Sequence, residues 1–302
     1  MASGGSAQGG ASNASGALRF GPAIAIPALL AVGQITTDPT VSADGLEMFF
    51  MSTRSGNKAL YRTTRASIEQ LWTAPELVSE LDSPSSESNP RLSGDGSTLW
   101  FYSDRDRAKG TLFQSNRATR SSSFGTPVVI AGLSTEGASD VSACPNESRS
   151  IAIVATLQDG VTNDYDLYEM RRDVVDAAFV LHSRLPNVNG ATEEFDPWLS
   201  PDGLHLAFHS NRNGNDDLFY TSRSTLAEDF PPAMPITSVD TAAVEVAPSL
   251  SADETRILVF LDSRWRRDHF RGRTTSLSCA DAGRRRHVVA GLGDGQSIWY
   301  AS

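Results

Sequence analysis

The sequence predicts an all-β protein in which one four-stranded antiparallel unit occurs five times. A segment resembling Asp-Pro-x-Leu-Ser-x-Asp-Gly begins at Asp38, Asn89, Asp140, Asp196 and Ala247, with spacings of 51, 51, 56 and 51 residues. Strand-like segments surround every copy. A unit of this size cannot bury its own apolar faces, so neighbouring copies must pack together to form the core. Four strands per unit and a regular period are typical of a β-propeller.

The first strand of each unit is expected to be the outer edge of its sheet. These segments begin with an aromatic residue, continue with aliphatic residues and, in most copies, contain proline. Proline cannot donate a hydrogen bond to a neighbouring strand, which favours an edge position. The five segments are 20–29, 72–78, 124–130, 179–185 and 230–236.

The repeated motif itself predicts the innermost strand and a tight turn. Asp-Gly at the end of the motif is a hairpin signal, because glycine tolerates a positive φ angle. The third and fifth copies carry Asn146-Glu147 and Asp253-Glu254 instead, so their turns should differ.

Two further strands complete each predicted unit. The second strand is apolar on both faces, as expected between neighbouring sheets. These strands are 47–51, 98–102, 150–154, 205–209 and 256–260, and the third strands are 60–62, 112–114, 166–168, 217–220 and 269–271.

Ring closure is predicted from the order of the strands. The chain begins with an outer strand, and no outer strand follows the fifth unit after Thr275. Residues 20–29 can therefore complete the fifth sheet, which would remove an open edge. We expect a five-bladed propeller closed by the N-terminal strand; the alternative is six blades, with the C-terminal segment beginning a degenerate sixth.

The chain divides into three predicted regions. Residues 1–17 are rich in Gly, Ser and Ala and should form a flexible linker, residues 18–276 the propeller, and residues 277–302 a C-terminal tail. Such linkers often separate a membrane anchor from an exported domain. The sequence thus favours a periplasmic, outer-membrane-associated or extracellular protein whose lost signal or lipoprotein segment could carry a lipid anchor. The alternative is a disordered cytoplasmic start.

Composition excludes several classes of partner and site. The formal net charge of −10 argues against nucleic acid, whose phosphates need a basic surface. No apolar run reaches the roughly 18 residues of a membrane helix. The two cysteines, Cys144 and Cys279, lack zinc-like spacing, and a disulfide between them stays open. A monomer is expected.

The repeated residues resemble a known family. The motif Asp/Asn-Pro-x-Leu-Ser-x-Asp-Gly, an aromatic strand, Ser-x-Arg and Asp-Leu-Tyr/Phe together resemble the WD40-like repeat (PD40) of TolB-type propellers over residues 20–276. The copy from Asp196 to Tyr220 is the closest match. This resemblance implies an exported binding or assembly module. TolB looks like a six-bladed ring with an extra N-terminal domain, so five blades would depart from it.

Candidate ligand-binding residues lie where the inner strands should meet the channel. Acidic and amide side chains at these positions could hold a cation such as Ca²⁺ or bind a polar ligand, or they could cap turns and pair with arginines. Residues that differ between copies are the better candidates, because a site usually breaks the repeat symmetry. The candidate set is Asp38, Asn89, Arg91, Asp140, Glu194, Asp196 and Trp198.

The sequence favours a non-catalytic module that binds a protein or an envelope glycan. Neither a Gly-x-Ser-x-Gly elbow nor a phosphate-binding loop is present. No cofactor, catalytic residue or metal ligand is assigned, although Ca²⁺ remains an option, including at the acidic segment 211–217. The alternative is a carbohydrate-active enzyme of the five-bladed glycosidase type, in which two channel carboxylates act as acid and as base or nucleophile.

Overall fold

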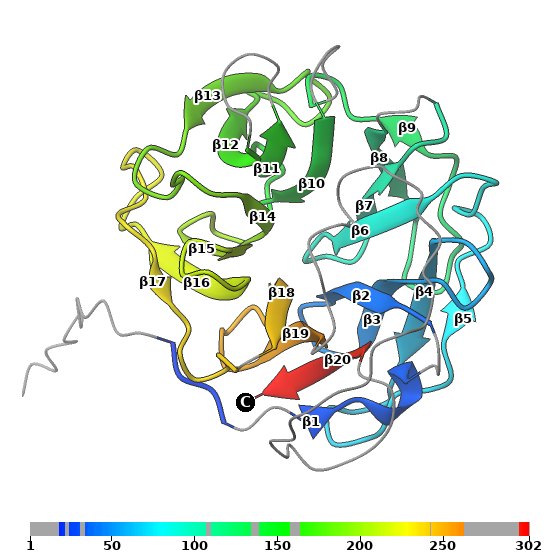
Figure 1. Ribbon diagram of the computed structural model, residues 1–302. Helices are drawn as coiled ribbons and strands as arrows, with labels where there is room; N and C mark the ends of the chain where they lie inside the picture. Colours follow the sequence, from blue (N-terminus) through cyan, green and yellow to red (C-terminus); the bar gives the residue numbers. More distant parts are fainter. Residues whose placement is uncertain are drawn as a thin grey trace, which may run out of the picture.

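The computed structural model describes a ring of antiparallel sheets arranged around a common centre (Figure 1). It describes residues 18–21, 24–30, 34–106, 110–133, 139–157, 164–241, 243–262 and 296–301. In these residues no helix is long and apolar enough to cross a membrane. The predicted all-β class and the four-stranded antiparallel blade are both confirmed.

Five four-stranded sheets are formed by the described residues. The first contains β2 (Thr36–Val41), β3 (Glu47–Ser52), β4 (Ala59–Thr64) and β5 (Glu76–Leu77). The second contains β6 (Glu87–Leu92), β7 (Thr98–Ser103), β8 (Thr111–Asn116) and β9 (Val128–Val129). The third contains β10 (Ser139–Pro145), β11 (Ile151–Leu157), β12 (Asp166–Arg171) and β13 (Val180–Arg184). The fourth contains β14 (Glu194–Leu199), β15 (His205–Ser210), β16 (Asp217–Ser222) and β17 (Met234–Pro235).

The last sheet joins the two ends of the chain. Its strand order is β1 (Ile24–Ala25), β20 (Gln296–Ala301), β19 (Ile257–Asp262) and β18 (Val244–Leu250). The N-terminal strand β1 pairs with β20 as the outer strand, and a short 3-10 helix, η1 (Pro27–Leu29), follows it. Proline at the start of η1 fits the first helical turn, where no amide hydrogen is needed.

One boundary predicted from the sequence is wrong. The sequence predicts a C-terminal tail over 277–302, yet residues 296–301 form the third strand of the last sheet along the full length of β19. The strand predicted at 269–271 lies outside the described residues. A long segment, 263–295, separates β19 from β20, so the regular period could not locate this strand.

The core lies between neighbouring sheets. The innermost strands β2, β6, β10, β14 and β18 each contact the next around the ring, and β18 also contacts β2. Apolar side chains from adjacent sheets form shared clusters; for example, Ile153 of β11 packs with Phe208 of β15. The second strands are therefore apolar on both faces because each face meets a neighbouring sheet.

The turn after each innermost strand is built by the repeated motif. In the first unit, the Ser42 hydroxyl donates to Asp44 Oδ1 at 2.6 Å, and Gly45 adopts a φ of 71°. Asn146 replaces this serine in the third unit, where Arg149 takes the positive φ of 55°. In the fifth unit Glu254 does so, also at 55°. The backbone hydrogen bonds of the turn are the same in these two units as in the first, so only the residue at the positive φ position differs, and the predicted change of the turn is wrong.

Two sets of arginines explain other repeated residues. The Ser-x-Arg arginine of the second sheet, Arg105, donates Nε to Ser103 Oγ at 3.1 Å and lies over two rings, those of Phe101 and Phe113. A second arginine, Arg117, covers the aromatic residue that begins the outer segment, Phe124, at 4.7 Å from the ring centroid. Such cation–π contacts stabilise the packing of each blade. These motifs are therefore structural.

Candidate functional site: the central channel

A bulge places one unusual residue of most innermost strands at the channel. The pairing register shifts between Thr37 and Thr40 in β2, and equivalent shifts occur in β6, β14 and β18. The residues with a positive φ angle in these bulges are Asp38, Asn89, Asp196 and Ala247, each followed by proline. Asp and Asn tolerate this left-handed conformation better than most residues, and a bulge accommodates a residue without an amide hydrogen.

Three predicted site residues meet in one buried network. Asn89 donates its backbone N–H to Asp38 Oδ2 at 3.2 Å and its side-chain amide to Asp196 Oδ1 at 2.6 Å. The Nδ1 atom of His209 lies 3.4 Å from Asp196 Oδ2, and Thr37 donates its hydroxyl to Asp38 at 3.1 Å. The sequence prediction that Asp38, Asn89 and Asp196 lie close together thus agrees with the structure, but their groups bond mainly to one another.

The two carboxyl groups of this network have opposite pKa shifts. Burial and the neighbouring Asp196 charge raise the pKa of Asp38 to about 6. Burial would also raise the pKa of Asp196, but the neighbouring His209, the charge of Arg91 and the hydrogen bond from Asn89 hold it below its usual value. The pKa of His209 is raised by Asp196 in spite of burial. Each group therefore favours the charged form of the other.

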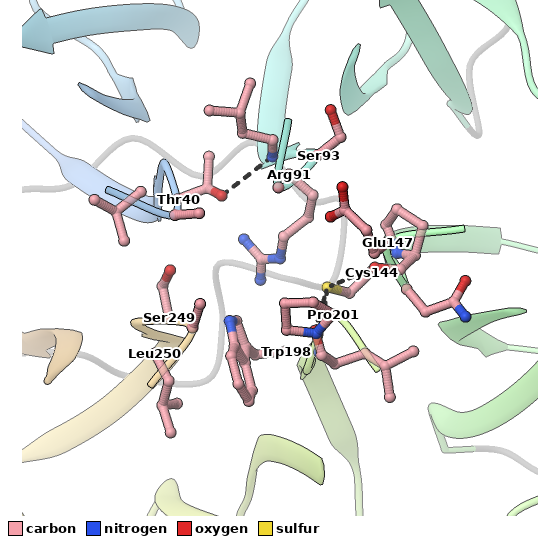
Figure 2. Close-up of a pocket in the computed structure, with 17 residues that line it drawn as sticks. Thr40, Arg91, Ser93, Cys144, Glu147, Trp198, Pro201, Ser249 and Leu250 are labelled. Atoms are coloured by element: carbon pink, nitrogen blue, oxygen red, sulfur yellow. Dashed lines mark hydrogen bonds between the residues drawn. The ribbon is translucent and has the colours of Figure 1, made fainter. Parts of the chain in front are cut away.

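A second set of channel residues lies nearer the turns, and its members differ in every sheet. In four strands this residue comes two positions after the bulge residue: Thr40 in β2, Arg91 in β6, Trp198 in β14 and Ser249 in β18. In β10 the matching register position is Cys144. Figure 2 shows the arginine, cysteine, tryptophan and serine side chains turned toward a common centre. They line a cavity of about 60 Å³. Turn residues such as Gly94, Glu147 and Pro201 complete its wall.

Arg91 supplies a buried positive charge to this cavity. Its side chain is only 2% exposed, and Nη1 donates to its own neighbour, the Pro90 carbonyl, at 3.0 Å. Nε reaches the Pro197 carbonyl at 3.4 Å, whereas Nη2 has no hydrogen-bond partner among the described residues. Within the described part of the chain, no carboxylate lies at ion-pair distance from this guanidinium. Such an unsatisfied buried donor is costly unless water or a ligand accepts from it.

Cys144 forms an inert wall of the cavity. Its sulfur accepts a hydrogen bond from the Leu199 amide at 3.2 Å, and burial raises the pKa of the thiol although Arg91 opposes this. The thiol therefore stays protonated near neutral pH, and an activated nucleophile is not supported here. Cys279 lies outside the described residues.

Two predicted site residues lie elsewhere. Glu194 accepts hydrogen bonds from Ser210 at 2.9 Å and from Arg212 at 2.9 Å, within its own blade and away from the cavity. In the third sheet Asp140 lies opposite Thr156, and in the fourth sheet Glu194 lies opposite Ser210 at the same register position. Asp140 is therefore the equivalent of Glu194 and not of Asp196. Between Asp140 and its turn the third unit has two more residues than the other units have between their bulge residue and the turn. Matching the five copies of the motif by sequence did not show this offset.

The structure adds residues that the sequence prediction did not include. Cys144 and Ser249 line the cavity, and His209 joins the carboxylate network. Ser249 could have been found from the 51-residue spacing to Trp198. Cys144 could not, because the motif of the third unit is offset. His209 comes from the second strand, which the repeat analysis treated as packing.

Solved structures similar to this chain include TolB proteins and a glycosidase. A structure from Agrobacterium tumefaciens assigned as TolB is 19% identical, with a TM-score of 0.50, over 77% of this chain and 72% of its own. TolB from Acinetobacter baumannii is 16% identical, with a TM-score of 0.50, over 77% of this chain but only 52% of its own.

The glycosidase likeness extends over nearly the whole of both chains. The catalytic domain of a GH62 α-L-arabinofuranosidase from Coprinopsis cinerea has a TM-score of 0.53 at 8% identity, over 94% of this chain and 96% of its own. No protein-family model matches the sequence, and no curated protein matches it either. Identities this low show the fold alone. The chain has the β-propeller fold and is similar in structure to TolB-type propellers.

Proposed function

We propose that the protein is a non-catalytic binding module that takes an anionic group, such as a carboxylate of a protein or an envelope glycan, into the cavity at Arg91. One observation carries this proposal: the guanidinium is buried at the wall of a cavity, and within the described part of the chain its Nη2 atom has no hydrogen-bond partner. Arginine suits carboxylate recognition because its planar donors match two acceptor oxygens.

The surroundings of Arg91 support a small, specific ligand group. A cavity of about 60 Å³ has room for a few waters or for one carboxylate, but not for a whole sugar ring. Trp198 offers an aromatic surface beside the guanidinium, and Ser249 offers a hydroxyl. The five different residues at one repeat position make the cavity asymmetric, as recognition of a single ligand requires.

A binding experiment tests the proposal. The protein would be titrated calorimetrically with three probes: an oligosaccharide containing uronic acids, a peptide with a free C-terminal carboxylate, and a neutral oligosaccharide. We expect one acidic probe to bind and the neutral one not to, and the acidic probe that binds identifies the source. The Arg91→Met variant, which keeps the packing of the stem, should lose at least about tenfold in affinity.

Controls keep this test decisive. Trp198→Phe preserves the charge and should weaken binding less than Arg91→Met, while circular dichroism and melting verify that both variants fold. Binding that survives Arg91→Met in a folded protein, or equal binding of the neutral probe, would contradict the proposal.

A hydrolase is a second candidate, and one observation favours it. The carboxyl groups of Asp38 and Asp196 have pKa values shifted in opposite directions, as in an acid–base pair. Against it, neither residue lines the Arg91 cavity, both are buried, and Asn89 occupies acceptor oxygens of each. The structural likeness to a GH62 α-L-arabinofuranosidase makes arabinofuranosides the first substrates to assay. Turnover that is lost in a folded Asp196→Asn variant would establish hydrolysis and overturn the non-catalytic proposal.

The proposal includes a complete five-bladed ring. The last sheet contacts the first through β18 and β2, which leaves the alternative of a sixth blade without a gap to occupy among the described strands. We further propose that the protein is exported, because residues 1–17 are a Gly/Ser/Ala-rich segment typical of linkers in exported proteins, and that it acts as a monomer. Cell fractionation of the full gene product and light scattering of the purified protein test these two points.

A further inference from the structure

A second polar site lies between the fourth and fifth sheets, apart from the Arg91 cavity. Asp217 begins β16, Asp240 lies in the loop before β18, and Glu245 belongs to β18. One carboxylate oxygen from each of these residues lies within 4.8 Å of the other two. Glu245 is fully buried, Asp217 is 7% exposed, and Asp240 faces the solvent.

The repeat shows what a glutamate at this position normally contacts. Glu87 and Glu194 occupy the equivalent positions of the second and fourth sheets. Arg105 Nη2 lies 3.1 Å from Glu87, and Arg212 Nη2 lies 2.9 Å from Glu194. In both sheets a guanidinium therefore compensates a buried carboxylate.

The fifth unit lacks this arginine at the equivalent place. The sequence Ser103-Asp104-Arg105 corresponds to Leu261-Asp262-Ser263, so serine replaces arginine. Two carboxylates, from Asp217 and Asp240, approach Glu245 instead.

One carboxylate oxygen of Glu245 is buried, and its charge is not balanced by any cation among the described residues. Its Oε1 accepts a hydrogen bond from the Thr241 hydroxyl, but its buried Oε2 has no hydrogen-bond partner among the residues that the structure describes. Glu87 also has an unpartnered Oε2, yet Arg105 balances its charge. Burial and the neighbouring acids Asp240 and Asp217 raise the pKa of Glu245 to about 7, which reflects uncompensated negative charge.

We propose that Asp217, Asp240 and Glu245 bind one divalent cation, of which Ca²⁺ fits best, in the role that arginine has in the second and fourth sheets. Calcium prefers oxygen ligands at about 2.3–2.6 Å, so two ligands on opposite sides of the ion lie about 5 Å apart. The observed limit of 4.8 Å is compatible with a shared ion. Exposed Asp240 provides an access route, and waters would complete the coordination. This inference is independent of the function proposed for the Arg91 cavity.

The test uses the full chain, freed of metal with a chelator and dialysed. Titration with CaCl₂ by calorimetry should give one site, and the melting temperature should rise with the Ca²⁺ concentration. Asp240→Asn changes an exposed ligand and should lower the Ca²⁺ affinity at least about tenfold. Asp229→Asn removes an equally exposed charge from outside the cluster and should leave the affinity unchanged.

A second variant tests the charge argument without added metal. Glu245→Gln removes the buried negative charge, so in the presence of chelator it should melt at or above the temperature of the original chain. The proposal is overturned if Ca²⁺ produces neither heat nor a shift in melting, or if Asp240→Asn binds as tightly as Asp229→Asn. The residue after Ser263 is Arg264, which lies outside the described residues. The proposal is equally overturned if the chain binds Ca²⁺ only after an Arg264→Ala change, because this arginine would then be the compensating cation.

Discussion

Replacing Arg117 with methionine should destabilise the ring more than any single exposed ion pair can. Arg117, which follows β8, reaches across to Glu47 of the first sheet with Nη1–Oε1 and Nη2–Oε2 distances of 2.9 and 2.6 Å. Both side chains are buried, at 1% and 0% exposure. Removing one partner of a buried pair typically costs about 3–5 kcal/mol, because the other charge stays behind without compensation.

The expected loss lies at the lower end of that range. Glu47 keeps contacts with Arg62 at 2.5 Å and with Arg120 at 3.5 Å, both partly exposed to solvent. Methionine also preserves much of the packing against Phe124, although the cation–π contact is lost. We therefore expect Arg117→Met to lower the free energy of unfolding by about 3 kcal/mol.

Urea denaturation monitored by circular dichroism measures this loss. Arg120→Met is the matched control, because Arg120 is 41% exposed and pairs with the similarly exposed Asp44. Its loss should be about 1 kcal/mol or less. If Arg117→Met costs no more than Arg120→Met, the reasoning that buried ion pairs join neighbouring blades is refuted.

Two further predictions concern pH and backbone conformation. Because the pKa of Asp38 is raised to about 6, the folded chain holds a proton there that the unfolded chain releases near pH 4. This carboxyl group therefore lowers the free energy of unfolding by roughly 3 kcal/mol as the pH rises from about 4 to about 6. Asp38→Asn should remove that part of the decline in melting temperature with pH. An unchanged pH profile would contradict a raised pKa at Asp38. A Cβ atom on Gly132, whose φ is 83°, would collide with the Phe179 backbone, whereas one on Gly56, at φ 96°, would meet no neighbour. In urea denaturation, Gly132→Ala should therefore lower the free energy of unfolding by well over the roughly 1 kcal/mol expected for Gly56→Ala. Equal losses in the two variants would show that the contact with Phe179 is not rigid.

The sequence was sufficient to predict the sheets because each unit repeats its local signals. Apolar strands that are buried on both faces, Asp-Gly turns and proline at the edge all lie where local chemistry requires them. Prediction failed where that regularity ends. Strand β20 follows a long segment that breaks the period.

The site was predictable only in part, for a physical reason. Arg91 and Trp198, chosen because they vary at one repeat position, line the same cavity, because the ring brings equivalent positions together around one axis. Glu194 was misplaced, since periodicity does not show which way a carboxylate turns, and here an arginine of its own blade binds it. The partnership of Asp196 with His209 also depends on a neighbouring strand whose side-chain direction the repeat does not reveal.

The pairing of β1 with β20, which joins the two ends of the chain, can be tested most directly by a disulfide cross-link. Ile24 lies opposite Tyr300 in the register. Opposite residues of an antiparallel pair have Cα atoms about 4.5–5.5 Å apart, a separation that a disulfide can bridge. The Ile24→Cys and Tyr300→Cys changes would be combined in a chain whose own two cysteines are replaced by serine. Mass spectrometry of the oxidised, digested protein should find the two peptides joined, with little joining when Leu30→Cys replaces Ile24→Cys. Absence of the cross-link in the folded protein, or equally rapid cross-linking from position 30, would contradict ring closure by the N-terminal strand.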